Sequence, residues 1–234
     1  MALDVTGSMG MIANAMIGES LGTLMGGILD TKPIADPHMM IMAIGDARSD
    51  DSPLQMSQFE ADIRIAQQLK EVYLEGGGGG NDTESYDLAW HAAATLTDID
   101  SWNKRGLKGY LFTIGDEMPP VGITRAQHSE IYGTPSEVDY TAAELLEMAK
   151  ERYEVFHVII EQGNFARRML PRVQGAWREL MGNRAIMCND YTRLSEVILS
   201  VIRVNEGESP DAVIASYPEC ATTIAHALYG PTGE

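Results

Sequence analysis

The stretch that decides the fold is residues 1–9, which read MALDVTGSM. Asp4, Thr6 and Ser8 stand at alternate positions in it, and Gly7 lets the chain turn without a side chain in the way. The pattern predicts a short strand, a tight turn and a helix that starts near Ser8. A carboxylate and two hydroxyls would meet at this turn, and hard oxygen donors of this kind favour Mg²⁺ or Mn²⁺.

The composition predicts a globular protein with one main domain. The chain has 234 residues, of which 44% are apolar and 22% charged. Its formal net charge is −17, from 34 acidic and 17 basic residues, so we expect no nucleic-acid partner. Cys188 and Cys220 are too few and too far apart for a metal knuckle or a disulfide framework. We recognise neither a signal peptide nor a membrane span and expect a cytoplasmic protein.

Apolar runs alternate with helical patterns along most of the chain. Strands are expected at residues 2–4, 38–44, 109–115, 155–160 and 184–188, with an edge strand at 54–59. Helices are expected at residues 9–29, 60–74, 84–97, 141–153, 165–181 and 192–205, with a long connection over 116–136. The alternation predicts a Rossmann-like α/β fold, whose mostly parallel central sheet has helices on both faces. We expect residues 1–205 to form this domain, and residues 206–234 to pack on it as an extension broken at Pro218.

Two further segments carry oxygen ligands at the ends of predicted elements. Five glycines at 76–80 precede Asn81, Asp82, Thr83 and Glu84, just before a predicted helix. Asp116 directly follows the buried strand 109–115. In parallel sheets, ligands bind beyond the carboxyl ends of the strands, so these segments can approach the first one.

Taken together, the three segments resemble the metal-ion-dependent adhesion site of the von Willebrand factor A (vWA) domain family. The Asp-x-Ser/Thr-x-Ser motif of the family corresponds to Asp4, Thr6 and Ser8, and its third element to Asp116. The Gly-rich second element corresponds to Glu84, with Thr83, Asp82 and Asn81 as alternates. The resemblance implies Mg²⁺, or Mn²⁺, bound by Asp4, Thr6, Ser8, Glu84 and Asp116. Only three residues precede Asp4, so the first strand is expected to be truncated.

The resemblance also implies a function. In the family, an open position on the metal accepts an Asp or Glu side chain from a partner protein, so we expect a protein-binding module or adaptor. A separate ATPase or a larger complex is a possible partner, because the chain lacks a phosphate-binding loop of its own. Two alternatives stay open: a metal-dependent phosphohydrolase with Asp4 as nucleophile, and a structural assembly component with a vestigial site.

Several residues have a second interpretation. Asn81 and Glu84 have the spacing of a capping box at a helix start, which competes with metal binding by Glu84. Glu117 is expected to be solvated, His157 to lie in the core, and His128 to lie in a loop where it could contact a partner. The helix predicted over 165–181 carries four arginines, Arg167, Arg168, Arg172 and Arg178. They form either a solvated face or a docking patch for an acidic partner.

Overall fold

The computed structural model describes the chain except residues 17–20, 63–64, 66–67, 69–71, 74–81 and 231–234. Its centre is a six-stranded sheet with the order β3-β2-β1-β4-β7-β8. The strands are β1 (Ala2–Asp4), β2 (Met42–Ile44), β3 (Leu54–Met56), β4 (Gly109–Gly115), β7 (Tyr153–Ile160) and β8 (Ala185–Cys188). All neighbours pair in parallel except β3, which runs antiparallel to β2 at the edge. The predicted fold class is therefore confirmed.

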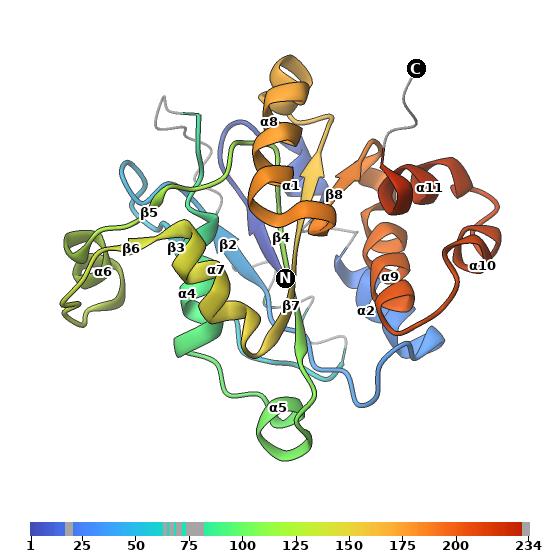
Figure 1. Cartoon of the computed structure of the whole chain (residues 1–234), viewed down its shortest axis with the longest axis horizontal. Helices are drawn as coiled ribbons and strands as arrows, with labels where there is room; N and C mark the ends of the chain where they lie inside the picture. Colours follow the sequence, from blue (N-terminus) through green and yellow to red (C-terminus); the bar gives the residue numbers. More distant parts are fainter. Residues whose placement is uncertain (17–20, 63–64, 66–67, 69–71, 74–81, 231–234) are drawn as a thin grey trace.

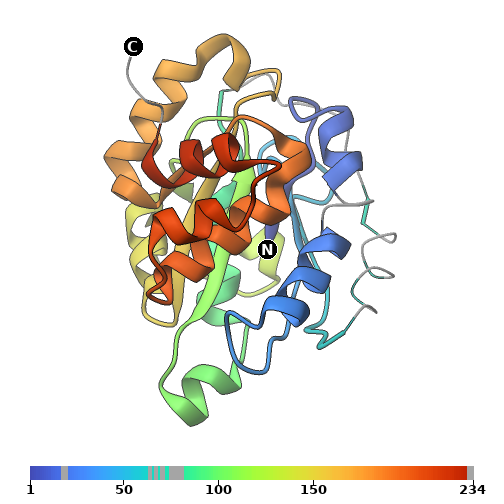
Figure 2. The ribbon, with the colours of Figure 1, turned by 90° about the vertical axis from the view of Figure 1, so that its right-hand side faces the viewer.

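Helices cover both faces of this sheet (Figures 1 and 2). One face packs against α1 (Met11–Ala15), α2 (Leu21–Thr31), α9 (Leu194–Asn205), α10 (Pro210–Ala215) and α11 (Ala221–Tyr229). The other packs against α4 (Tyr86–Thr95), α7 (Ala142–Lys150) and α8 (Ala166–Met181). Neighbouring strand residues point to opposite faces, so Phe112 joins the first core and Leu111 the second. In the described part of the chain, no helix is both long and apolar enough to span a bilayer.

The remaining elements lie outside these layers. Helix α5 (Asp100–Arg105) lies at the amino end of β4, and two short 3₁₀ helices cover Gly182–Arg184 and Tyr191–Arg193. Helix α6 (Arg125–Tyr132) lies between β5 (Gly122–Ile123) and β6 (Tyr140–Thr141), which pair as a two-stranded ribbon. Within α11 and α10, Ile224 and Val213 are buried in the same core as α9. The division of the chain at residue 205 stays a prediction.

The order of the strands changes direction at β1. From β1 the chain continues to β2 on one side, whereas β4 pairs with the other side of β1. The carboxyl ends of β1 and β4 therefore lie at a switch in strand order, where open α/β sheets bind their ligands. Asp4 ends β1, and Asp116 directly follows β4.

Two expected elements differ from the structure. The strand expected over 38–44 is ordered as a strand only at Met42–Ile44, because the Ile41 amide donates to the Ser57 hydroxyl (2.9 Å) instead of extending the ladder. The long connection expected over 116–136 contains α6, whose start is fixed by a capping box between Thr124 and Gln127. The helices expected over 9–29 and 60–74 extend into residues outside the described ones.

Candidate functional site

The first segment of the site is the turn that follows β1. The buried Asp4 carboxylate accepts two hydrogen bonds on Oδ1, from the Thr6 amide (2.9 Å) and the Thr6 hydroxyl (2.6 Å). Its Oδ2 accepts a hydrogen bond from the Tyr86 hydroxyl on α4 (3.0 Å). The Thr6 hydroxyl lies 3.3 Å from the Ser8 hydroxyl. The turn thus brings one carboxylate and two hydroxyls together, as the spacing predicted.

The second segment is Asp116, which reaches the turn from the end of β4. The Ser8 hydroxyl donates to Asp116 Oδ1 (2.7 Å), and the Phe165 amide, just before α8, donates to Oδ2 (2.8 Å). The Asn164 amide also donates to the Ser8 carbonyl (3.1 Å). An unbroken chain of contacts therefore joins Asp4 to Asp116 across 112 positions of sequence. Whether these oxygens bind a metal stays a prediction.

The third segment contributes Glu84, whose side chain is only 3% exposed. Its Oε2 has no hydrogen-bond partner. Burial raises the pKa of Glu84 to about 10, with further contributions from the nearby Asp4, Glu117 and Asp46 carboxylates. The capping-box interpretation is wrong, because α4 begins at Tyr86 and its N-cap is Ser85.

The alternates to Glu84 have other surroundings. Asp82 is exposed, and its Oδ2 lies 2.8 Å from an Arg172 guanidinium nitrogen on α8. Thr83 is half-buried and forms an isolated parallel bridge with Met118. Asn81 lies outside the described residues. Of the described candidates in this segment, Glu84 is the one whose pKa is raised by the charge of Asp4.

Glu117 is a site residue that the sequence-based interpretation missed. It is 6% exposed, and its Oε2 has no hydrogen-bond partner. The expectation that it is solvated is wrong because α8 covers it: the Trp177 indole donates to the Glu117 carbonyl (2.8 Å). Burial raises its pKa to about 8, with contributions from Asp4 and Asp116. The available signal was its position, one residue after an acid at the end of a buried strand.

Asp46 is another buried acid that the sequence-based interpretation missed, and it lies two residues beyond the end of β2. Its Oδ1 accepts a hydrogen bond from the Arg48 amide (2.9 Å), so it also stabilises its own turn. Its carboxylate contributes to the raised pKa of Glu84. Like Glu117, Asp46 could have been found from its position shortly after the end of a buried strand.

Asp4, Glu84, Asp116 and Glu117 form a carboxylate cluster, and the raised pKa values of its members indicate that it would be stabilised by a positive charge. Burial, and then the charge of Asp116, raise the pKa of Asp4 to about 7, and burial also raises the pKa of Asp116. Within the part of the chain that the structure describes, no lysine or arginine is among the main groups that shift the pKa values of Asp4, Glu84, Asp116 and Glu117. Buried charges need a counter-charge or hydrogen bonds. Oxygen-only donors are the ligand type that Mg²⁺ and Mn²⁺ prefer, so these residues fit such an ion.

An aromatic layer supports the cluster from below. The buried His157 ring stacks on Trp177, with ring centroids 3.4 Å apart, and the edge of Tyr86 packs against both rings. His157 Nδ1 lies 2.9 Å from the Thr113 hydroxyl, and burial lowers the pKa of His157, so the ring is neutral. The expected core position of His157 is confirmed. This packing fixes the Tyr86 hydroxyl at the Asp4 carboxylate.

Two glycines allow the parts of the site to approach closely. A Cβ on Gly115 would lie 2.0 Å from the Tyr86 hydroxyl, and a Cβ on Gly163 would lie 2.2 Å from the Asp116 Cβ. Real Cβ atoms do not approach so closely, so any side chain at either position would displace a site residue.

His128, which the sequence placed in a loop, has an internal role instead. It is a buried residue of α6, and its Nε2 lies 3.2 Å from His91 Nε2 on α4. Its Nδ1 lies 2.9 Å from the Thr134 carbonyl oxygen. Burial and the neighbouring His128 lower the pKa of His91 to about 4. The pair joins α6 to α4, so the partner contact considered for His128 is not supported.

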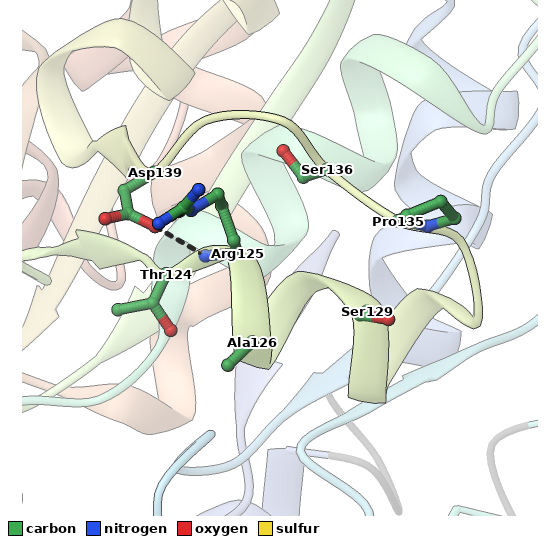
Figure 3. Close-up of a pocket in the computed structure, with 7 residues that line it drawn as sticks. All are labelled: Thr124, Arg125, Ala126, Ser129, Pro135, Ser136 and Asp139. Atoms are coloured by element: carbon green, nitrogen blue, oxygen red, sulfur yellow. Dashed lines mark hydrogen bonds and ion pairs between the residues drawn. The ribbon is translucent and has the colours of Figure 1, made fainter.

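Other candidate sites are weaker. The surface depression in Figure 3 contains one ion pair, between Arg125 and Asp139, and it is lined by Thr124, Arg125, Ala126, Ser129, Pro135, Ser136 and Asp139. A cluster of Glu196, Glu219 and Cys220 could also approach one ion, but Glu196 already pairs with Arg193 (3.0 Å). Neither feature is a cluster of buried acids like Asp4, Glu84, Asp116 and Glu117.

Comparison with protein-family models finds no match, and no curated protein matches the chain. Solved structures do share the fold. Proximal thread matrix protein 1 from the mussel byssus aligns with a TM-score of 0.52 and 12% identity, over 86% of this chain and 45% of its own. The pilus adhesin SpaC from Lactobacillus rhamnosus GG, in its open conformation, aligns with a TM-score of 0.55 and 10% identity, over 92% of this chain and 30% of its own.

These similarities define the class of fold. The six-stranded, mostly parallel sheet with helices on both faces is a Rossmann-like, vWA-like fold. At identities of 10–12% the likeness concerns the fold alone. The chain spans less than half the length of these solved proteins.

Proposed function

We propose that this chain is a divalent-cation-dependent protein-binding module, in which Mg²⁺ or Mn²⁺ at the carboxyl edge of the sheet accepts an acidic side chain from a partner protein. The observation that carries the proposal is the buried cluster of Asp4, Glu84, Asp116 and Glu117, for which no described lysine or arginine is a main influence on the pKa. Glu84 and Glu117 each leave one buried carboxylate oxygen without a hydrogen-bond partner.

Asp4, Thr6, Ser8, Glu84 and Asp116 would hold the ion, and Glu117 adds a further oxygen that the sequence did not suggest. A bound Mg²⁺ supplies a positive charge with at least one exchangeable position. Tyr86 and the Phe165 amide hold the Asp4 and Asp116 carboxylates in place through hydrogen bonds. The site is thus pre-organised by groups that would not themselves contact the ion.

Two further observations support the proposal. Two of the solved proteins that share the fold are by name a pilus adhesin and a byssus matrix protein, which agrees with a role in protein interaction. Cys188 and Cys220 are free and buried, which agrees with a reducing compartment such as the cytoplasm. A separate ATPase or larger complex remains a candidate partner.

The first experiment measures metal binding directly. Isothermal titration of the wild-type chain with MgCl₂ and MnCl₂ should give one saturable site, and Asp4→Ala should abolish it. Asp82→Asn is the matched control, because Asp82 is an exposed acid of the same segment that pairs with Arg172 instead. Unchanged binding in Asp4→Ala would overturn the proposed ligands. Absence of binding at millimolar Mg²⁺ and Mn²⁺ would favour a structural component with a vestigial site.

The second experiment addresses the partner and the enzyme alternative. Protein partners captured in Mg²⁺ should be lost in EDTA and with Asp4→Ala. A phosphohydrolase would need an acid at position 6, where the Thr6 hydroxyl instead donates to Asp4. Hydrolysis of a generic phosphoester that disappears in Asp4→Asn would establish the enzyme and contradict the binding module.

A further inference from the structure

Two arginines at the start of α8 form no ion pair with any acid that the structure describes. Arg167 and Arg168 are exposed on the first turn of this helix. Their hydrogen bonds go to one residue: Arg167 donates to the Asn164 side-chain oxygen (3.2 Å) and Arg168 to the Asn164 carbonyl (2.9 Å). Among the described residues, no acidic side chain forms an ion pair with either guanidinium.

Several other cations on this molecule do pair with acids. The chain has twice as many acidic as basic residues, 34 against 17. On the same helix Arg172 pairs with Asp82 (2.8 Å), and elsewhere Arg105 and Arg125 lie 3.7 Å and 3.4 Å from aspartate oxygens. Two adjacent guanidiniums that lack such a partner can therefore pair with carboxylates from outside the chain.

The two arginines border the carboxylate cluster. The Asn164 residue that they hold donates its amide to the Ser8 carbonyl (3.1 Å), and the next amide, of Phe165, donates to Asp116. Figures 1 and 2 show α8 and α1 at the same edge of the sheet. A ligand that reaches Ser8 and Asp116 from solvent therefore arrives beside this arginine pair.

Apolar side chains are exposed at the same edge. Met11, the first residue of α1, is 86% exposed. Met169 is 37% exposed and directly follows Arg168, where the helical backbone is interrupted (φ −127°, ψ 23°). Methionine adapts its shape to a contacting surface at low cost. The edge thus combines guanidinium groups with flexible apolar contacts.

We infer that the partner binds this edge through an acidic segment that carries at least two carboxylates and an apolar residue. One carboxylate reaches the cation, a contact that rests on the proposed function, and the next pairs with Arg167 and Arg168. The apolar residue packs against Met11 or Met169. The net charge of −17 opposes an acidic partner only weakly, because salt screens charges that lie more than about 8 Å away under physiological conditions. Within that distance the guanidinium groups of Arg167 and Arg168 attract the carboxylates of the partner.

The test uses a short fluorescein-labelled peptide of alternating glutamate and leucine, with a lysine–leucine peptide of equal length for comparison. Fluorescence anisotropy gives the Kd in Mg²⁺ and in EDTA. The variant is Arg167→Gln/Arg168→Gln. The matched control is Arg105→Gln/Arg178→Gln, which removes the same charge from α5 and from the far end of α8. Circular dichroism verifies that both variants fold.

We expect the wild-type chain to bind the acidic peptide in Mg²⁺, and Arg167→Gln/Arg168→Gln to bind it about tenfold more weakly, as for the loss of two exposed ion pairs. The control should bind like the wild type. Equal binding by both double variants would overturn the arginine contact and leave the cation site intact. Binding that needs the arginines but ignores EDTA would support the arginine contact and contradict the proposed function. Preference for the lysine peptide, or no binding of the acidic one, would overturn the inference.

Discussion

Replacing Asp4 with asparagine should stabilise the metal-free protein at alkaline pH. The substitution keeps the shape of the side chain and removes a charge from the cluster. Without a cation, burial and Asp116 raise the pKa of Asp4 from 3.8 to about 7. The folded state therefore keeps a proton that the unfolded chain releases. Stability falls as the pH rises through this window and does not recover above it.

The magnitude follows from the size of the pKa difference. About three units, at about 1.4 kcal/mol each, cost the folded state roughly 4 kcal/mol at pH 8. Asparagine avoids this cost, and the pKa of about 7 already includes the charge-assisted hydrogen bonds from Thr6 and Tyr86, so their loss is not counted again. We therefore expect Asp4→Asn to be more stable than the wild type by about 4 kcal/mol at pH 8 in EDTA. Near pH 4 the advantage should vanish.

Urea unfolding followed by tryptophan fluorescence measures the effect in EDTA and in Mg²⁺. At a Mg²⁺ concentration of about 1,000 Kd the wild type should gain roughly 4.1 kcal/mol, while Asp4→Asn gains much less, so the two proteins become about equally stable. Asp82→Asn, which breaks an exposed ion pair, should change stability by less than about 1 kcal/mol in either buffer. If Asp4→Asn is the less stable protein in EDTA at pH 8, the cluster tolerates its charge without a cation, and the physical basis of the metal site is lost.

Three further substitutions test the structure around the site. Gly163→Ala should displace Asp116 and destabilise the fold by about 1–3 kcal/mol, with weaker Mg²⁺ binding by titration calorimetry, whereas Gly175→Ala, which has open space at its Cβ, should do neither. Tyr86→Phe should remove the hydroxyl that holds Asp4, at a cost of about 1–2 kcal/mol in urea unfolding and with weaker Mg²⁺ binding; unchanged affinity would show that this hydroxyl does not position the ligand. The pKa of His91 is lowered from 6.5 to about 4, so the wild type should lose stability as the pH falls through that range, by up to about 3 kcal/mol, and His91→Gln should lose less; parallel acid unfolding curves would contradict this.

The part of the site that the sequence predicted is the part fixed by strand order. Asp4 and Asp116 each end a buried strand, and parallel strands present their carboxyl ends at the same edge. Thr6 and Ser8 follow from the turn after β1. Their meeting was therefore predictable from local patterns and one rule of topology.

The parts that were missed depend on packing between distant segments. Whether Glu117 is solvated depends on Trp177, 60 positions later, which covers its backbone. Asp46 follows the strand that was predicted to begin at residue 38 but begins at Met42. The Ile41 amide donates to the Ser57 hydroxyl, whereas the prediction had it pair with a neighbouring strand. Helix α6 was missed although Thr124 and Gln127 carry a capping-box signal, since its mostly polar sequence lacks a strong apolar stripe.

The charge of the cluster decides whether an acidic partner is compatible with the site. If Asp4, Glu84, Asp116 and Glu117 were all ionised, one divalent ion would leave two negative charges in excess and would repel a partner carboxylate. In the metal-free chain the pKa values of Glu84 and Glu117, about 10 and 8, keep both protonated at pH 7, and we expect them to stay neutral oxygen donors when the ion binds. The two aspartates then balance the ion. Mg²⁺ binding at pH 7 should then release fewer than two protons, drawn from Asp4 and Asp116, whose pKa values are both raised in the metal-free chain. Titration calorimetry in buffers of different ionisation enthalpy measures this number, and a release of two or more protons would mean that the glutamates ionise on the metal, leaving a site that favours a basic partner.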